Sequence, residues 1–473
     1  MFYSTNDKKN KVSFEKALLT GLAPDYGLYM VSRKDIPKLS DEEMQGMIGQ
    51  TYPEIAFRVL RLFLKHEIRD DELRPLLQDA YDESIIPTEV QHVRDNMHML
   101  WLTKGPTYSF KDYAARFYAR TLDHFLGKKG LKRSVIVATS GDTGGAVADA
   151  LHGLDNVINI VFFPKGEISE RQRRQMTTLA GNVYAFEVNG DFDVCQSLAK
   201  ALIGDRGYAL TVTGDKDNFT SANSISLGRL LPQAVYPFYA YSKIGKEMVA
   251  SVPSGNFGDM MGTVIARQIG LPISKILIGL NPNKPFMDFL ENGKYEVKPS
   301  IPTPSSAMKV SHPSNLARLI DFYGGHMYDE RKEGKVIREG IIGTMPDLEE
   351  MRKDFFAASI TNEDHYAMMR EFYKRHNIFI CPHTAVGWRT AEIFGESEKP
   401  VIVYATADAG KFPDDVKKAT GEIPELPEGM KRQMELAERI LTIEKEPEKT
   451  EAGIRLSDDQ LDEAKKKIAG IFR

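Results

Sequence analysis

The sequence predicts an α/β protein in which helices cover parallel sheets on both faces. The first observation is an alternation that begins near Ser134, where the apolar runs RSVIVAT, VINIVFF and NVYAFEV have the composition of buried strands. The second is that amphipathic segments separate these runs, such as TGGAVADALHG, which ends at Gly153, and DFDVCQSLAKALIG, which ends at Gly204. Short apolar strands that alternate with helices are typical of βαβ units.

The same alternation continues toward the C-terminus. Further strands are predicted for EMVASV, KILIGL, NIFICP and VIVYATA, which begin at residues 247, 275, 377 and 401. Further helices are predicted for ISERQRRQMTTLAG (168–181), for about Asn223–Ser242 and for GDMMGTVIARQIG (258–270). Prolines at 302, 304 and 313 predict loops in the segment 283–350.

The two ends of the chain have a different pattern. The first ~95 residues have helical character, with a helix start at Ser40 and apolar residues on one face over Glu54–His66. The last residues predict helices over Met430–Ile443 and Asp458–Ile471. We therefore expect a mostly helical N-terminal domain (1–95), a core of two α/β subdomains (96–412, the smaller about 135–245) and a charged helical extension (413–473).

Composition excludes several classes of function. The 473 residues include 62 basic and 66 acidic residues, and a net charge of −4 offers no positive field for nucleic acid or an anionic membrane. The apolar runs are shorter than the ~18 residues of a membrane span, and the N-terminus lacks a signal core. Two cysteines cannot form a disulfide framework or a structural zinc site. We expect a cytoplasmic enzyme without a metal ion.

Two glycine-rich turns each follow a predicted strand and open a helix. They are TSGDTGG (139–145) and VPSGNFGD (252–259). Such turns present main-chain N–H groups and the positive end of a helix dipole, which bind anions. Neither turn has the dinucleotide or P-loop spacing. Together they indicate a phosphorylated cofactor or substrate at the carboxyl ends of parallel strands.

The segment GPTYSFKD (105–112) places Lys111 at the start of a predicted helix. A helix N-terminus disfavours a positive charge, so this position lowers the pKa of an amine. A lowered pKa suits a lysine that forms a Schiff base.

These blocks, in this order, resemble the threonine synthases of the longer bacterial and fungal type, which are fold type II pyridoxal-phosphate enzymes. The resemblance extends through TSANSISLGRLLPQ (220–233), AMKVSHPSNLARL (307–319), CPHTAVG (381–387) and ATADAGKFPD (405–414). It implies two parallel-sheet domains with the cofactor, pyridoxal 5'-phosphate, in the cleft. The activity that it implies is a lyase reaction that converts O-phospho-L-homoserine and water to L-threonine and phosphate.

The resemblance also implies roles for individual residues. Lys111 would carry the cofactor, and Thr406 would face its ring nitrogen. The other cofactor residues would be Asp142, where many relatives have an asparagine near the ring 3'-oxygen, and Gly255, Asn256, Phe257, Gly258 and Asp259 around the cofactor phosphate. The substrate residues would be Ser109, Ser140, Thr143, Asn223, Ser224, Arg229, Ser311 and Asn315.

Three matters stay open at this stage. There are two alternative functions. One is a threonine dehydratase-like enzyme of the same fold, and the other is a non-catalytic homologue that binds phosphorylated ligands. His312 and His383 resemble acid–base groups, but a lone histidine is more often structural. The oligomeric state is open between a monomer and a homodimer.

Overall fold

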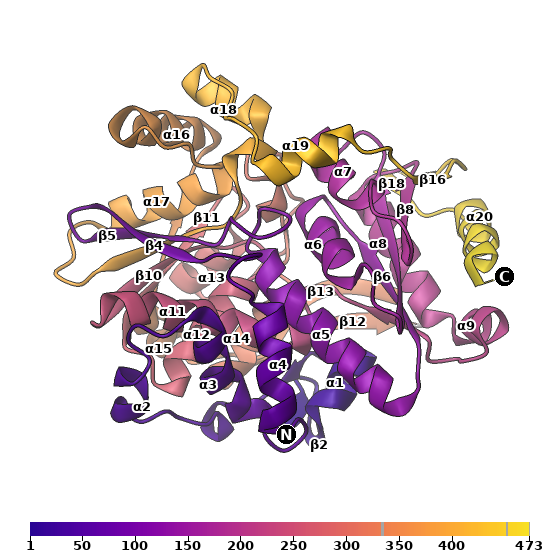
Figure 1. Cartoon of the computed structure of the whole chain (residues 1–473), viewed down its shortest axis with the longest axis horizontal. Coiled ribbons are helices and arrows are strands. Elements are labelled where there is room, and N and C mark those ends of the chain that lie inside the picture. The colour runs from indigo at the N-terminus through magenta and orange to yellow at the C-terminus, as the bar shows by residue number, and fades with distance from the viewer. Residues whose placement is uncertain (333–334, 451–452, 473) are drawn as a thin grey trace. The chain divides into compact units, whose positions relative to one another are not determined.

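The computed structural model describes residues 1–332, 335–450 and 453–472. The chain forms two compact units, whose helices and strands are labelled in Figure 1. Unit 1 comprises Met1–Leu18, Leu22–Phe117 and Ser224–Glu425, and unit 2 comprises Leu19–Gly21, Tyr118–Asn223 and Leu426–Arg473. Each unit contains its own parallel sheet, as the alternation of strands and helices predicts.

The sheet of unit 1 has six strands in the order β14-β11-β10-β15-β5-β4. Neighbours are parallel except for the antiparallel pair β4 and β5. Every residue of β10 and β15 is buried, which explains their unbroken apolar sequences, because helices cover both faces of a central parallel strand. The strands are β4 (Glu89–Arg94), β5 (Met97–Trp101), β10 (Met248–Pro253), β11 (Ile273–Leu280), β14 (Phe355–Ser359) and β15 (Val401–Ala405).

Two helices are most important for the site in unit 1. Helix α12 (Gly258–Ile269) follows β10, and α17 (Pro382–Phe394) packs its Trp388 against Leu277 of β11 and Val403 of β15. Helices α16, α17 and α18 lie together in Figure 1. Further helices of this unit are α3 (Tyr52–Leu64), α4 (Asp70–Ala80), α10 (Leu227–Leu230), α11 (Val235–Ile244), α13 (Pro285–Asn292), α14 (Leu316–Phe322), α15 (Leu348–Asp354), α16 (Asn362–His376) and α18 (Pro413–Thr420).

The N-terminal segment contains a small sheet as well as helices. Strands β1 (Phe2–Ser4), β2 (Asp7–Val12) and β3 (Tyr29–Met30) are antiparallel in the order β2-β1-β3. Helix α1 (Phe14–Thr20) follows β2, and α2 (Asp41–Gln45) begins after Ser40, whose side chain forms a capping box. The helix start predicted at Ser40 is confirmed, whereas helical character alone does not describe residues 1–30.

The segment 283–350, for which the prolines predict loops, contains a hairpin. Strands β12 (His326–Lys332) and β13 (Lys335–Thr344) pair antiparallel. Residues 295–304, which include Pro302 and Pro304, form neither helix nor strand. The loop predicted from these prolines is confirmed.

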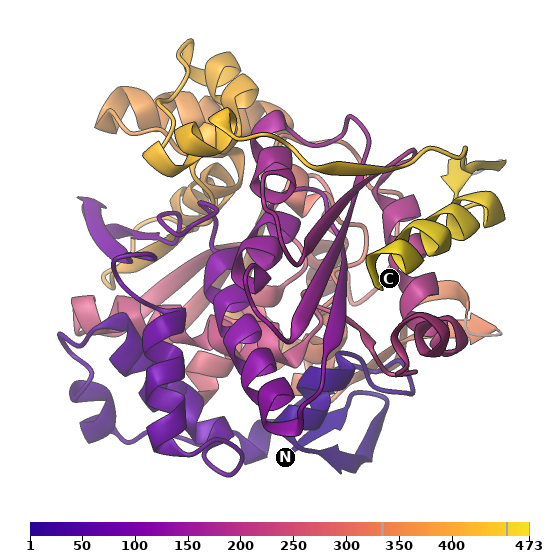
Figure 2. The same ribbon diagram turned by 45° about the vertical axis from the view of Figure 1, so that its right-hand side comes forward.

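The sheet of unit 2 has five parallel strands in the order β16-β8-β7-β6-β9. Its core joins Ile136, Phe162 and Phe186 with Leu198 of α8 and Ile468 of α20, the yellow helix in Figure 2. The strands are β6 (Arg133–Ala138), β7 (Val157–Pro164), β8 (Val183–Val188), β9 (Phe219–Ser221) and β16 (Ile440–Ile443). The helices are α6 (Asp142–Leu151), α7 (Glu170–Thr177), α8 (Phe192–Gly204), α9 (Arg206–Thr213), α19 (Glu428–Glu435) and α20 (Asp458–Ala469), with the hairpin β17 (Glu448–Thr450) and β18 (Gly453–Arg455).

Three predicted elements differ from the structure. The helix predicted for Met430–Ile443 ends at Glu435, and β16 pairs with β8 because that strand would otherwise have an open edge. The strand predicted at 377–382 is wrong: Asn377 ends α16 in the left-handed region, and Pro382 begins α17. The helix predicted from Asn223 begins at Leu227 and tightens into a 3-10 turn at Leu231–Ala234.

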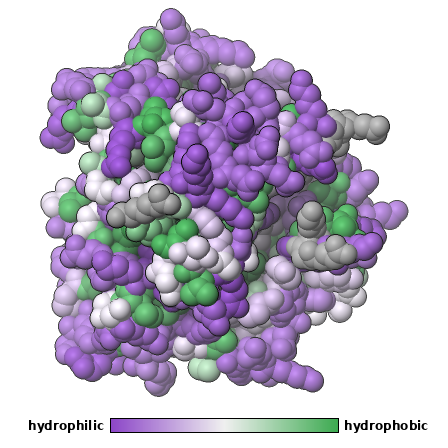
Figure 3. Space-filling view, turned by 90° about the vertical axis from the view of Figure 1, so that its right-hand side faces the viewer, coloured by the Kyte–Doolittle hydropathy of each residue, from purple (hydrophilic) through white to green (hydrophobic). Residues whose placement is uncertain are grey.

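Among the described residues, we find no helix that has the length and apolar character needed to cross a bilayer. On the face shown in Figure 3, hydrophilic residues predominate and the hydrophobic ones are scattered.

Candidate active site

Three of the sequence blocks follow neighbouring strands of the sheet in unit 1. The Lys111 block follows β5, the Thr406 block follows β15, and the glycine-rich turn at Gly255 follows β10. Because β5, β15 and β10 are parallel neighbours, their carboxyl ends meet at one edge of the sheet. Open α/β sheets bind ligands at this edge.

Main-chain hydrogen bonds join the Lys111 loop to the Thr406 segment. The N–H of Phe110 donates to the carbonyl of Thr406 at 2.8 Å, and the N–H of Asp408 donates to the carbonyl of Tyr108 at 2.9 Å. Ser109, between these bonds, forms an antiparallel bridge with Ala407. The loop before Lys111 therefore has a fixed position relative to the end of β15.

Side chains hold the same loop from within. Asp112 accepts a hydrogen bond from the N–H of Thr107 at 3.0 Å, and the ammonium of Lys411 donates to the carbonyl of Thr107 at 2.7 Å. Lys111 is the first residue of α5 (Lys111–Lys129), as predicted, and its Nζ lies 4.5 Å from the centre of the Phe110 ring.

Two buried hydroxyls next to this loop are unsatisfied. The Oγ of Ser109 and the Oγ1 of Thr406 make no hydrogen bond to any part of the chain that the structure describes. Their residues are 0% and 5% exposed. A buried polar atom without a partner costs free energy, so both positions suit the polar atoms of a bound molecule.

The glycine-rich turn leads from β10 into α12. Phe257 has a φ of +61°, which aims the turn into the N-terminus of the helix at Gly258. A Cβ on Gly255 would lie 2.9 Å from the Cα of Met308, so glycine is required by this close approach. The turn and the first N–H groups of a 12-residue helix form an anion-binding arrangement.

Asp259, in the first turn of α12, is a buried acid. Burial raises the pKa of its carboxyl to about 6, and the positive charge of Lys111 and the N–H of Met260 oppose this rise. The carboxylate also accepts a 2.9 Å hydrogen bond from that N–H. Asp259 thus faces into the protein and is held by the first turn of α12.

A polar network joins the glycine-rich turn to two of the predicted substrate segments. Asn315 donates its side-chain amide to the carbonyl of Asn256 at 2.9 Å and its main-chain N–H to the same oxygen at 3.2 Å. The Ser314 and Ser224 hydroxyls are 3.2 Å apart. The structure therefore brings Asn256, Asn315 and Ser224 together. Ser311, three residues before Ser314, is half-buried.

Arg229 lies in the short helix α10 and is only 3% exposed. Arg229 is therefore not a solvated surface residue, as most arginines on helices are. Its carbonyl accepts a 2.8 Å hydrogen bond from the amide of Gln233, and Gln233 also lies against Gly258. A buried guanidinium in this position suits an anionic ligand.

Four of the predicted site residues belong to unit 2. Ser140, Asp142 and Thr143 lie at the turn from β6 into α6, and Asn223 ends the unit. Within this turn the Thr139 hydroxyl accepts hydrogen bonds from the N–H groups of Gly141 and Gly144.

Asp142 is 4% exposed, and its carboxylate accepts a hydrogen bond from the Gln172 amide at 3.0 Å. Its contact with the 3'-oxygen of a cofactor stays a prediction.

The two histidines both have structural partners. Tyr295 and the Nδ1 of His312 are 2.7 Å apart, and burial lowers the pKa of that imidazole. His383 accepts a hydrogen bond from the N–H of Ala307 at 3.1 Å. These bonds agree with the structural role expected for both.

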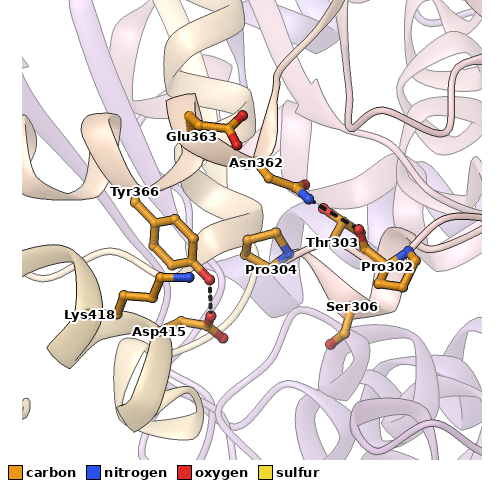
Figure 4. Close-up of a pocket in the computed structure, with 9 residues that line it drawn as sticks. All are labelled: Pro302, Thr303, Pro304, Ser306, Asn362, Glu363, Tyr366, Asp415 and Lys418. Atoms are coloured by element: carbon orange, nitrogen blue, oxygen red, sulfur yellow. Dashed lines mark hydrogen bonds between the residues drawn. The ribbon is translucent and has the colours of Figure 1, made fainter.

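A separate pocket of about 570 Å³ lies beside α16 and α18 (Figure 4). The Tyr366 hydroxyl donates to Asp415 at 2.8 Å, and the Lys418 ammonium lies 4.1 Å from the centre of the Tyr366 ring. Asn362 donates to the carbonyl of Pro302. No residue predicted for the site is among the described residues that line this pocket.

Comparison with known proteins agrees with this arrangement. The family model "Threonine synthase N terminus" matches residues 1–81, "Pyridoxal-phosphate dependent enzyme" matches 99–334, and "Threonine synthase, C-terminal" matches 384–454. The threonine synthase of Pseudomonas aeruginosa is 34% identical over 469 residues, which cover 95% of this chain and 97% of the relative. This chain belongs to the threonine synthase family.

Other members of the family are similar over nearly the whole chain. The threonine synthase of Saccharomyces cerevisiae is 32% identical and covers 94% of this chain, with 95% of its own length matched. The crystal structure of PLP-bound threonine synthase from Brucella melitensis superimposes with a TM-score of 0.88 at 29% identity, and covers 100% of this chain and 99% of that one. The fold type II architecture expected from the sequence blocks is confirmed.

Sequence reasoning assigned no role to Lys411 or Arg318, which lie within threonine synthase blocks. Both side chains are completely buried and donate hydrogen bonds to the segments around the candidate site. The sequence contained one indication of a role for Arg318. It follows Asn315 by three residues, and side chains at this spacing contact each other on a helix.

Proposed function

We propose that this chain performs the last step of threonine biosynthesis, the conversion of O-phospho-L-homoserine and water to L-threonine and phosphate, with pyridoxal 5'-phosphate as cofactor. The observation that carries the proposal is the hydrogen-bonded pairing of the Lys111 loop with the Thr406 segment, beside the turn at Gly255. The cofactor has an aldehyde, a ring nitrogen and a phosphate. To bind all three, the lysine, the hydroxyl and the glycine-rich turn have to lie at one edge of the sheet.

The residues of this edge fit the cofactor. Lys111 would bind its aldehyde carbon covalently, the turn at 255–258 would hold its phosphate, and the unsatisfied Thr406 hydroxyl would meet its ring nitrogen. When bound, the cofactor delocalises the negative charge that develops on the substrate carbons. A neutral hydroxyl, in contrast to a carboxylate, leaves the ring nitrogen largely unprotonated.

Lys111 is the proposed base. Once the substrate amine has replaced Lys111 on the aldehyde carbon, the freed lysine amine would take the proton from Cα of the substrate and release it to the bound cofactor. It would then take a proton from Cβ, deliver it to Cγ after phosphate has left, and return one to Cα after water has added at Cβ. The hydrogen bonds of Phe110 and Thr107 hold the loop before Lys111, which keeps the amine in position for successive transfers.

The substrate phosphate needs donors of its own. Arg229 supplies a permanent charge and a fork of N–H groups, and the Ser224 hydroxyl supplies a neutral donor. These groups would bind the γ-phosphate and stabilise it as it leaves, before water adds at Cβ. Relatives that act on amino acids without a phosphate have no need of such a set.

The decisive experiment incubates the purified, cofactor-loaded protein with O-phospho-L-homoserine. Equal amounts of phosphate and L-threonine are expected. A parallel incubation with L-threonine or L-serine tests for a keto acid, which a dehydratase would form. Keto acid without threonine formation, or binding of the phosphorylated amino acid without any product, would favour one of the two alternatives.

A further inference from the structure

Arg318, in α14, is a completely buried arginine. Its Nε donates to the carbonyl of Tyr29 at 3.0 Å and its Nη2 to the carbonyl of Ile225 at 2.6 Å. Its Nη1 donates to the side-chain oxygen of Asn315. All three acceptors are uncharged.

No carboxylate in the described residues forms an ion pair with Arg318. Asp321, one turn further along α14, accepts a hydrogen bond from Tyr3 and lies 2.6 Å from the ammonium of Lys8. Asp321 therefore has partners of its own. Burial lowers the pKa of Arg318 to about 9, so the guanidinium keeps its charge at neutral pH. Its hydrogen bonds are satisfied, but its charge is not neutralised.

Two of the three acceptors of Arg318, on Asn315 and Ile225, belong to the segments around the proposed phosphate site. Asn315 contacts Asn256 of the glycine-rich turn, and Ile225 follows Ser224 directly in sequence. Arg318 thus joins α14 to the Ser224–Ile225 segment directly and to the glycine-rich turn through Asn315. Burying an uncompensated charge is costly for the fold, and an anion bound nearby would offset that cost.

We propose that Arg318 is a positioning residue for the phosphate of the substrate. It fixes the backbone at Ser224–Ile225, which carries the Ser224 hydroxyl, and through Asn315 it holds the turn at Asn256. Its buried positive charge favours a dianionic ligand over a neutral one. This inference rests on the proposed function, because the dianion is the leaving group of that reaction.

The test measures binding of two probes, inorganic phosphate and L-serine, to the cofactor-loaded protein by calorimetry. In Arg318→Gln, which keeps donors but removes the charge, phosphate should bind at least about tenfold more weakly. In Arg318→Lys, which keeps the charge but not the fork, the loss should be smaller, about threefold to tenfold. Serine affinity should stay within about twofold in both, since serine carries no phosphate.

Arg116→Gln and Arg116→Lys are the matched controls. Arg116 is also buried and donates to two main-chain carbonyls, those of Ala80 and Asp79. These variants should leave phosphate binding unchanged. The proposal would be wrong if the Arg318 variants bound serine as much more weakly as they bound phosphate, or if they bound phosphate with the wild-type affinity. The same holds if the wild-type protein bound no phosphate. Should Arg318→Gln fail to fold, the Arg318→Lys result decides by the same two criteria.

Turnover of the wild-type protein separates this inference from the proposed function. If wild-type protein forms threonine but Arg318 variants do not discriminate phosphate from serine, only the role of Arg318 fails. If it forms no threonine but the variants discriminate as expected, the proposed function fails and Arg318 stays a positioning residue for a phosphate anion.

Discussion

The N–H of Phe110 donates a 2.8 Å hydrogen bond to the carbonyl of Thr406, although the two residues are almost 300 positions apart in the chain. This bond and the antiparallel bridge between Ser109 and Ala407 tie the two chain segments together again beyond the ends of β5 and β15, which pair in parallel. Lys111 therefore follows a segment that the sheet itself positions.

Replacing Lys111 tests its assignment as the cofactor lysine. Lys111→Ala should keep the fold but lose the visible absorbance of the lysine-bound cofactor and all threonine formation, since no other amine occupies the start of α5. Absorbance, circular dichroism and product analysis check this. The exposed Lys104→Ala is the control. Cofactor that borohydride still attaches to a different lysine would contradict the assignment.

Adding a methyl group to the glycine-rich turn tests the phosphate site of the cofactor. Gly255→Ala should weaken cofactor affinity at least about tenfold, because the new Cβ meets the main chain of Met308 at 2.9 Å. Gly258→Ala should cost less, since its Cβ meets the end of the flexible Gln233 side chain. Equilibrium binding measures both.

Gly204→Ala is the control for this pair, because no atom within 4 Å opposes a Cβ there. If Gly255→Ala and Gly204→Ala bound the cofactor equally well, its phosphate would lie elsewhere, for example at Ser140–Gly145.

The unsatisfied hydroxyl of Thr406 predicts two effects of opposite sign. Thr406→Val should leave the cofactor-free protein as stable as before, or more stable by up to about 1 kcal/mol, because a buried group without a partner is removed. Cofactor affinity should fall about fivefold, since the ring nitrogen loses its donor.

Thr390→Val is the matched control, because the Thr390 hydroxyl is buried but donates to the carbonyl of Val386 at 2.8 Å. It should cost about 1 kcal/mol of stability and leave cofactor binding unchanged. Denaturant unfolding and cofactor titration provide the readouts. If the two variants changed stability and cofactor affinity equally, the hydroxyl of Thr406 would not contact the ring nitrogen of the cofactor.

Arg229 is expected to recognise the substrate phosphate directly. Losing a charged contact to a desolvated phosphate costs about 2–5 kcal/mol, so Arg229→Leu should lower kcat/KM for O-phosphohomoserine by orders of magnitude. Cofactor binding and spectral binding of L-serine should be nearly unchanged. If both substrates were impaired equally, Arg229 would be a structural residue.

Asp259 predicts a pH dependence of stability. Burial raises the pKa of its carboxyl from 3.8 to about 6, so between these pH values the folded state binds more protons than the unfolded state. The protonated carboxyl of Asp259 therefore contributes its full share to the free energy of unfolding below pH 3.8, and this share is lost as pH rises through 6.

Asp259→Asn cannot ionise and should not lose stability in this way. Its free energy of unfolding relative to wild type should rise by up to about 3 kcal/mol between pH 4 and pH 7, measured by urea unfolding of the cofactor-free protein. A difference that does not change with pH would mean that water reaches the carboxyl.

Local signals in the sequence predicted much of the fold. Continuous apolar runs predicted β6, β7, β10 and β15, because a strand with both faces covered tolerates few polar residues. A capping residue predicted where one helix begins, since Ser40 caps α2. Asp191, the first residue of the predicted segment DFDVCQSLAKALIG, caps α8 through the N–H of Val194. The glycine-rich turns and the position of Lys111 at a helix start were also readable, since each depends on a few adjacent residues.

Other features depend on partners that are distant in sequence. Residues 440–443 form a strand because the edge of β8 is available to them, and the apolar run at 378–381 is a linker because Asn377 and Pro382 end and begin helices on either side. Propensity alone cannot predict such outcomes, because tertiary pairing overrides it. The boundaries of the three domains stay a prediction from the sequence.

The sequence by itself determined the family blocks, the alternation of strands and helices, and the chemical types available to the site. Only the tertiary structure decided that Arg229 and Arg318 are buried, that Asn315 contacts Asn256, and that the hydroxyl of Thr406 has no partner in the described chain. The physical reason is that burial, and hydrogen bonds between distant segments, are properties of the packed sheet and its loops. A residue's neighbours along the chain do not specify them.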